Sequence, residues 1–68
     1  MRVDVELLPG RTKKSTEVPA GGTGESLFQA LGLAVDAHIL VRGDVPIPVD
    51  EPLRDGERLT VIAVASGG

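Results

Sequence analysis

Apolar and polar residues alternate near the start of the chain. Between Arg2 and Leu8, valine and leucine occupy the odd positions, and charged residues occupy the even positions as far as Glu6. A period of two is typical of a strand that buries one face. The turn signal Pro9-Gly10 follows, and a second extended segment over 14–18 completes a predicted hairpin.

A helical spacing of apolar residues follows a glycine-rich loop over 19–24. These residues recur at i, i+3 and i+4 and form one stripe, widened by Phe28: Leu27, Ala30 and Leu31. Thr23 is a suitable N-cap, because its hydroxyl can accept a hydrogen bond from a free N–H of the first turn. Gly32 is suited to the left-handed conformation that ends many helices. We therefore expect a helix over 23–31, too short to be stable unless it packs on the sheet.

The second half of the chain predicts three more extended segments. His38–Arg42 reads as a strand. Pro46 and Pro48 then mark a short edge strand, because proline lacks the N–H that a further strand would need. Arg58–Ala65 is the last strand and the most apolar one. A hairpin, a helix and these strands together predict a two-layer α+β domain.

Alternation along the strands also predicts which apolar side chains point away from the helix. The face that packs on the helix is assigned Val3, Val5, Leu7, Leu59, Val61 and Ala63. On the third strand, Ile39 and Val41 are expected to point inward and Leu40 outward. The outward apolar residues are then Leu8, Leu40, Ile62 and Val64. An exposed apolar patch on a small domain usually marks an interface; the alternative is that the tail or a second copy covers part of it.

Composition and charge exclude several classes of function. The 68 residues include no cysteine, so the chain has no disulfide and no thiolate ligand for a metal. The net charge is −3 and tryptophan and tyrosine are absent, which argues against direct binding of nucleic acid. No stretch approaches the roughly 20 apolar residues of a membrane span, and the charged first strand is unlike a signal peptide. We expect a soluble, cytoplasmic monomer that binds no cofactor.

Two features that suggest ligand chemistry do not match the motifs that would carry it. The loop Gly21-Gly22-Thr23-Gly24 lacks the lysine of a P-loop, and Leu27 stands where a dinucleotide-binding motif needs its last glycine. We expect this loop to be a flexible connection. His38 is the single histidine, and Asp36 and Asp44 near it have no spacing typical of a metal site. We expect His38 to be a surface residue of its strand.

The chain ends in Gly67-Gly68, shortly after the apolar strand. Without Cβ atoms, two glycines make the thinnest and most flexible tail that a polypeptide can present. Such a tail can enter a narrow channel and place its carboxylate in the active site of another protein. The sequence thus predicts a domain over 1–65 and a flexible tail over 66–68.

The order of the elements and three short motifs resemble the ubiquitin-like β-grasp family. The motifs are Val41-Arg42-Gly43-Asp44, Leu53-Arg54-Asp55-Gly56-Glu57 and the Gly67-Gly68 end. The resemblance covers essentially the whole chain and implies a mixed sheet of four to five strands with one helix packed across it. Within the family, the chain is most similar to prokaryotic sulfur carriers for tRNA 2-thiouridine synthesis and to small archaeal ubiquitin-like modifiers. Carriers for thiazole synthesis remain close, whereas the insertion expected of the molybdopterin synthase small subunit is missing.

The resemblance implies a protein that is a substrate and carrier and catalyses nothing itself. An adenylating enzyme of the ubiquitin-activating type, which uses ATP and Mg, would activate the carboxylate of Gly68. A sulfur donor of the desulfurase or rhodanese type would then convert the adenylate to a thiocarboxylate for a tRNA thiolase or another sulfur-accepting enzyme. In the modifier branch, a lysine amine of a target protein attacks instead and forms an isopeptide bond.

The resemblance also implies that the adenylating enzyme docks on the outer face of the sheet. The expected contact residues, beside the activated Gly67 and Gly68, are Leu8, Leu40, Ile62, Val64 and Ser66. A second hypothesis is a β-grasp interaction domain that is never conjugated and whose Gly-Gly end is incidental. The apolar patch fits both hypotheses, and activation of the tail separates them.

Overall fold

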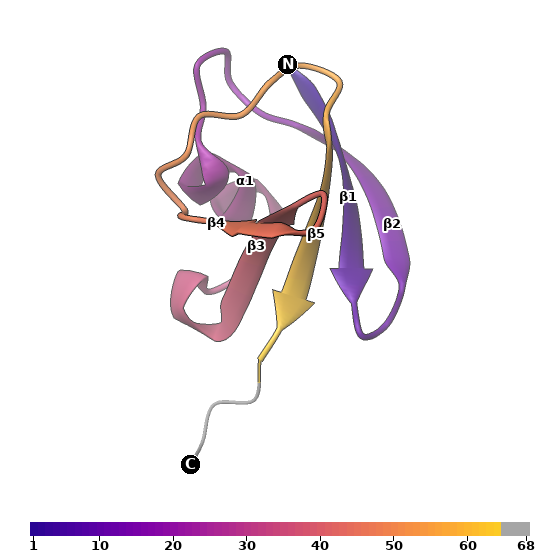
Figure 1. The fold of residues 1–68 in the computed structure, drawn as a ribbon. Coiled ribbons are helices and arrows are strands. Elements are labelled where there is room, and N and C mark those ends of the chain that lie inside the picture. The colour runs from indigo at the N-terminus through magenta and orange to yellow at the C-terminus, as the bar shows by residue number, and fades with distance from the viewer. Residues whose placement is uncertain (65–68) are drawn as a thin grey trace.

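In the computed structural model, the described residues 1–64 form a five-stranded sheet with a helix on one face (Figure 1). The strands are β1 (Arg2–Leu8), β2 (Thr12–Glu17), β3 (His38–Arg42), β4 (Val45–Ile47) and β5 (Arg58–Ala63). The helix α1 spans Gly24–Leu31, and a 3-10 turn, η1, spans Val35–Ala37. The predicted α+β class is confirmed, with five strands.

The last strand lies in the centre of the sheet. The strand order is β2-β1-β5-β3-β4, in which β5 pairs parallel to β1 and antiparallel to β3. β1 and β5 run in the same direction, so β5 ends at the opposite end of the sheet from Met1 (Figure 1). β4 is an edge strand, as Pro46 and Pro48 predicted.

The core lies between the sheet and α1. Its buried apolar residues come from four elements and two loops: Val3, Val5, Val18, Leu27, Phe28, Leu40, Leu53, Leu59 and Val61. The alternation along β1 and β5 predicted the inward residues of those strands except Ala63, which lies at the end of β5 and is exposed. On α1, Ala30 is likewise exposed, so Leu27 and Phe28 fill the core.

The facing predicted for β3 is wrong. Leu40, expected on the outer face, is 1% exposed, whereas Ile39 is 41% exposed. Leu40 is the register partner of Val61, which points toward the helix, and paired residues on neighbouring strands share a face. Three consecutive apolar residues, Ile39 to Val41, fit either facing equally well. The pairing of β3 with β5 decides between the two.

The ends of α1 follow the sequence signals closely. Thr23 is the N-cap, with extended backbone angles, and its N–H donates to the Ser26 hydroxyl over 3.2 Å. Gly32 follows the last turn with a φ of 71°, the left-handed conformation that glycine adopts without strain. Local capping chemistry therefore sets both ends of this short helix.

The glycine-rich loop before α1 is packed, contrary to the expectation of a flexible connection. Gly22 and Gly24 are buried, and the Gly22 carbonyl accepts a hydrogen bond from the Leu53 N–H over 3.0 Å. A Cβ on Gly24 would lie 2.5 Å from Leu40 Cδ2 and 3.0 Å from the Val49 carbonyl oxygen. The glycine is therefore needed because the start of α1 approaches β3 and the loop after β4 too closely for a side chain.

The reversed facing of β3 makes a direct prediction about stability. Leu40→Ala removes buried methyl groups and should lower the free energy of unfolding by about 2–5 kcal/mol. Ile39→Ala truncates a neighbouring side chain on the outer face and should change it by no more than about 0.5 kcal/mol. Urea unfolding of the two variants beside the parent chain measures both values. A larger loss for Ile39→Ala than for Leu40→Ala would contradict this facing.

Candidate docking surface

An apolar patch lies on the outer face of the sheet, opposite α1, where β5 ends. Ile62 is the register partner of both Leu8 on β1 and Ile39 on β3, so the three side chains are aligned across neighbouring strands. Val41 is the next outward-facing residue of β3 after Ile39; it also belongs to the patch and pairs with Thr60. Ile39 is the most exposed member, and the other three are half-buried. Leu8, Ile39, Val41 and Ile62 are called the outer patch below.

The outer patch leads directly to the end of the described chain. Val64 follows β5, is 37% exposed, and donates its N–H to the Ala37 carbonyl over 3.0 Å. This hydrogen bond holds the backbone against η1 up to the last described residue. Ser66 and the activated Gly67 and Gly68 predicted from the sequence lie outside the described residues.

The structure brings together three of the four described residues that the sequence assigned to this surface. Leu8, Ile62 and Val64 are accessible there, whereas Leu40 is in the core. Sequence reasoning missed Ile39 and Val41, which take the place of Leu40 on the outer face. The register of β3 against β5 would have identified them, but the sequence of β3 alone does not determine that register.

Arg42 ends β3, directly after Val41 of the outer patch, and its side chain links β3 to the segment that precedes β5. Its Nε and Nη2 donate to the two carboxylate oxygens of Glu57 over 2.9 and 3.2 Å. Nη1 donates to Glu51 over 3.1 Å, and Nη2 also donates to the Pro52 carbonyl over 3.0 Å. Glu57 immediately precedes β5, and Arg42 is the register partner of Leu59. The bidentate pair therefore joins β3, the loop over 49–57 and the start of β5.

Glu57 remains ionised because its hydrogen bonds outweigh its burial. Its side chain is only 12% exposed, and this desolvation alone would raise the pKa of the carboxyl. The hydrogen bonds from Arg42 and from the Arg54 N–H, the latter 2.7 Å long, overcome that effect and hold the pKa of Glu57 below its ordinary 4.5. The Glu57 carboxylate in turn raises the pKa of Arg42. Both partners are thus charged at neutral pH.

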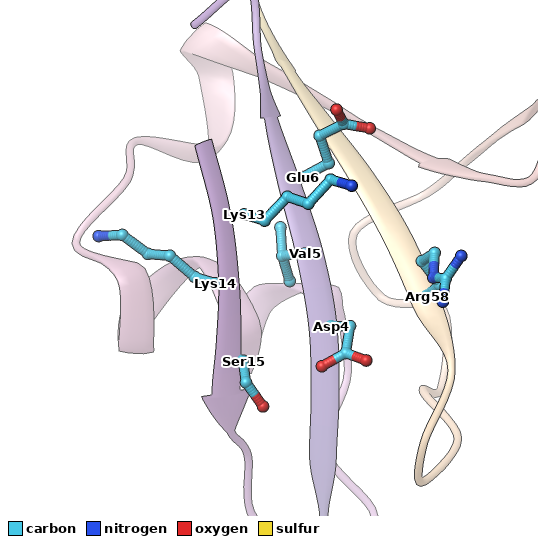
Figure 2. Close-up of a pocket in the computed structure, with 7 residues that line it drawn as sticks. All are labelled: Asp4, Val5, Glu6, Lys13, Lys14, Ser15 and Arg58. Carbon is cyan, nitrogen blue, oxygen red and sulfur yellow. The ribbon is translucent and has the colours of Figure 1, made fainter. Parts of the chain in front are cut away.

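The candidates for ligand binding among the described residues are one open groove and the acidic side chains. An open groove of about 330 Å³ crosses the outer face over β1, β2 and β5 (Figure 2). Its lining mixes charges of both signs: Asp4, Glu6, Lys13, Lys14 and Arg58. Within residues 1–64, no three His, Asp or Glu side chains are grouped to hold a metal ion. In the same part of the chain, no helix is long and apolar enough to cross a membrane.

His38, expected at the surface, is half-buried on the helix side of the sheet. Its ring centroid lies 6.0 Å from that of Phe28, and its Nδ1 lies 2.7 Å from the Ala34 carbonyl oxygen. These contacts give the single histidine a packing role between β3, α1 and the segment before η1.

The Arg42–Glu57 pair predicts a dependence of stability on pH. The pKa of Glu57 is lower in the folded state than its unfolded value of about 4.5. Its contribution to the free energy of unfolding is therefore complete above pH 4.5 and is lost as the pH falls through the lower pKa of the folded state. Glu57→Gln should therefore be less stable than the parent chain at pH 7. As the pH is lowered below 5, the variant should lose less further stability than the parent loses. Thermal unfolding across this range measures both effects. Asp44→Asn, an exposed acid outside the pair, is the control, and an acid profile of Glu57→Gln identical in slope to the parent would contradict the assignment.

Comparisons with known proteins agree with this architecture. No family model matches the chain. An uncharacterised protein of Archaeoglobus fulgidus is 30% identical over 69 residues, and the alignment covers 100% of both chains. Among solved structures, SAMP1 from Haloferax volcanii has a TM-score of 0.76 at 17% identity, with 100% of both chains covered. Caldiarchaeum subterraneum ubiquitin has a TM-score of 0.74 at 18% identity, covering 100% of this chain and 98% of the other.

A further ubiquitin-like protein from Caldiarchaeum subterraneum has a TM-score of 0.61 at 17% identity, covering 98% of this chain and 100% of the other. The structural matches extend over the whole sheet, including the central β5, and over α1. The chain therefore has the ubiquitin-like β-grasp fold and belongs to the same family as the Archaeoglobus fulgidus protein.

Proposed function

We propose that the protein is a ubiquitin-like modifier or sulfur carrier whose Gly68 carboxylate is activated by a partner enzyme. The observation that carries the proposal is the outer patch, an accessible apolar surface on the strands that flank and include β5. β5 leads within a few residues to Gly67-Gly68. An enzyme that holds the outer patch would thereby hold the strand from which the tail extends.

The chemistry requires activation because a carboxylate is a poor electrophile. An adenylating enzyme of the ubiquitin-activating type would join the Gly68 carboxylate to the AMP part of Mg-bound ATP and release pyrophosphate. The resulting mixed anhydride is reactive. Attack by a sulfur donor of the desulfurase or rhodanese type gives a thiocarboxylate, which a tRNA thiolase would consume. Attack by a lysine amine gives an isopeptide bond instead.

The outer patch suits a docking role better than a role in folding. Ile39 leaves 41% of its surface exposed although its strand, β3, pairs with β5 on one side and with β4 on the other. Burying apolar area of this kind against a partner stabilises a complex, whereas a charge placed there would be desolvated without a counter-charge. A domain of this size has few other apolar residues to spare from its core.

Ile39→Asp and Ile62→Asp should therefore bind the adenylating enzyme at least about tenfold more weakly, equal to about 1.4 kcal/mol. Val45→Asp is the matched control, because Val45 is 62% exposed but pairs with Arg42, whose position on β3 alternates with the outward Val41. A titration of each variant against the enzyme gives the affinities, and circular dichroism checks the fold. Normal binding by a folded Ile39→Asp would exclude the outer patch as the docking surface.

Activation of the tail is tested by intact mass. After incubation with the adenylating enzyme, ATP and a sulfur donor, the chain should gain the mass of one oxygen exchanged for sulfur. A chain that lacks Gly68 should stay unchanged in mass and keep the thermal stability of the parent, because the core formed by buried residues between Val3 and Val61 would remain whole. If the enzyme charges another carrier and leaves this chain unchanged, the protein is a non-conjugating interaction domain.

A further inference from the structure

The pairing of β5 with β3 ends at a defined residue. The last pair of the ladder is His38 with Ala63. One hydrogen bond follows it, from the Val64 N–H to the Ala37 carbonyl over 3.0 Å. An antiparallel pair of this kind exchanges two hydrogen bonds, one in each direction. The return bond would need the Ala37 N–H, which instead donates to the Ala34 carbonyl over 3.2 Å within η1. The 3-10 turn therefore ends the ladder at Val64.

On the other side of β5, the neighbouring strand turns away before this point. β1 ends at Leu8, the register partner of Ile62, and the turn at Pro9-Gly10 then leads the chain to β2. Val64, the residue directly beyond β5, is held through its N–H by the Ala37 carbonyl. The backbone of Val64 therefore takes its position from η1.

The side chain of His38, the first residue of β3, holds η1 in place. Its Nδ1 lies 2.7 Å from the Ala34 carbonyl oxygen, and since a carbonyl oxygen can only accept, Nδ1 donates. The Ala34 carbonyl thus accepts hydrogen bonds from both the His38 ring and the Ala37 N–H. The imidazole also lies 6.0 Å from the ring of Phe28, centroid to centroid. One side chain therefore ties the 3-10 turn to β3 and to α1.

The residue at which β5 leaves the ladder sets the reach of the chain beyond it. Four residues, Ala65 to Gly68, follow Val64 in the sequence. Each of them that joined the ladder would take about 3.4 Å from the distance that the Gly68 carboxylate can cover. A strand that frayed before Val64 would lose the direction that the sheet gives it. Activation depends on this placement, because a reacting group misplaced by about 1 Å reacts much more slowly.

We propose that His38 is a positioning residue for the activation of Gly68. Its hydrogen bond to the Ala34 carbonyl holds η1, and η1 ends the β3–β5 ladder at Val64. The inference rests on the proposed function, which supplies the partner enzyme and the reaction. The His38 side chain lies on the helix side of the sheet, so a partner docked on the outer patch would not touch it. A change at His38 should therefore alter the rate of activation and leave docking intact.

Three variants test this role through pyrophosphate release by the adenylating enzyme with ATP, measured over a range of chain concentrations. His38→Leu removes the donor and keeps an apolar side chain; it should lower kcat at least about fivefold and change KM less than about twofold. His38→Asn, whose side-chain amide offers a donor near the place of Nδ1, should restore most of the rate. Val35→Ala, a change at an exposed residue of the same turn, is the matched control and should behave like the parent. Circular dichroism checks each fold, and His38→Val, a second variant without a donor, takes the place of His38→Leu if that chain does not fold.

Amide hydrogen exchange at Val64, followed by NMR, checks the structural step without any enzyme. The Val64 N–H should exchange at least about threefold faster in His38→Leu than in the parent, and at the parent rate in Val35→Ala. Unchanged exchange in His38→Leu, or faster exchange with an unchanged kcat, would overturn the inference. A loss confined to KM, or a His38→Asn as slow as His38→Leu, would overturn it as well, because the effect would then lie in docking or in ring packing. If the parent chain itself supports no pyrophosphate release, the proposed function fails, and the inference fails with it.

Discussion

The pairing of β5 with both β1 and β3 is the constraint on which the rest of the structure depends. It joins residues from the two ends of the described chain in one parallel ladder and closes the sheet around its most apolar strand. Its inward residues, Leu59 and Val61, meet the helix, and its outward Ile62 aligns Leu8 with Ile39. One strand therefore organises the core on one face and the outer patch on the other.

Such a long-range pairing needs a device that fixes its register, since a slip of one residue would exchange the two faces. The two hydrogen bonds between Arg42 and Glu57 are suited to this, because they join the end of β3 to the residue before β5. The same arginine holds the intervening loop through Glu51. The close approach of Gly24 to Val49 holds that loop from the helix side. The charged pair and the alignment of Ile39 with Ile62 thus belong to one and the same register of β3 against β5.

The sequence predicted what is decided locally and failed where distant pairing decides. Thr23 and Gly32 carry the capping chemistry that bounds α1, so its limits were predictable. The facing of β3 was not, because Ile39, Leu40 and Val41 are all apolar and the choice belongs to the ladder with β5. Arg42 and Glu57 were both recognised within motifs, but their contact follows from the register, which neither motif contains.

Because side chains alternate along a strand, residues that are neighbours in the sequence lie on opposite faces of the sheet. In a domain of 68 residues, the core occupies one side of the central strands, so their accessible side chains lie on the other side. Lys13 and Lys14 have the same chemistry and neighbouring positions, yet Lys13 pairs with Glu6 on the outer face and Lys14 pairs with Val5, whose side chain faces the helix. The two lysines therefore start from opposite faces of β2 for the same reason that Leu40 and Ile39 differ in burial. The face that a side chain takes is set by the sheet and not by the residue.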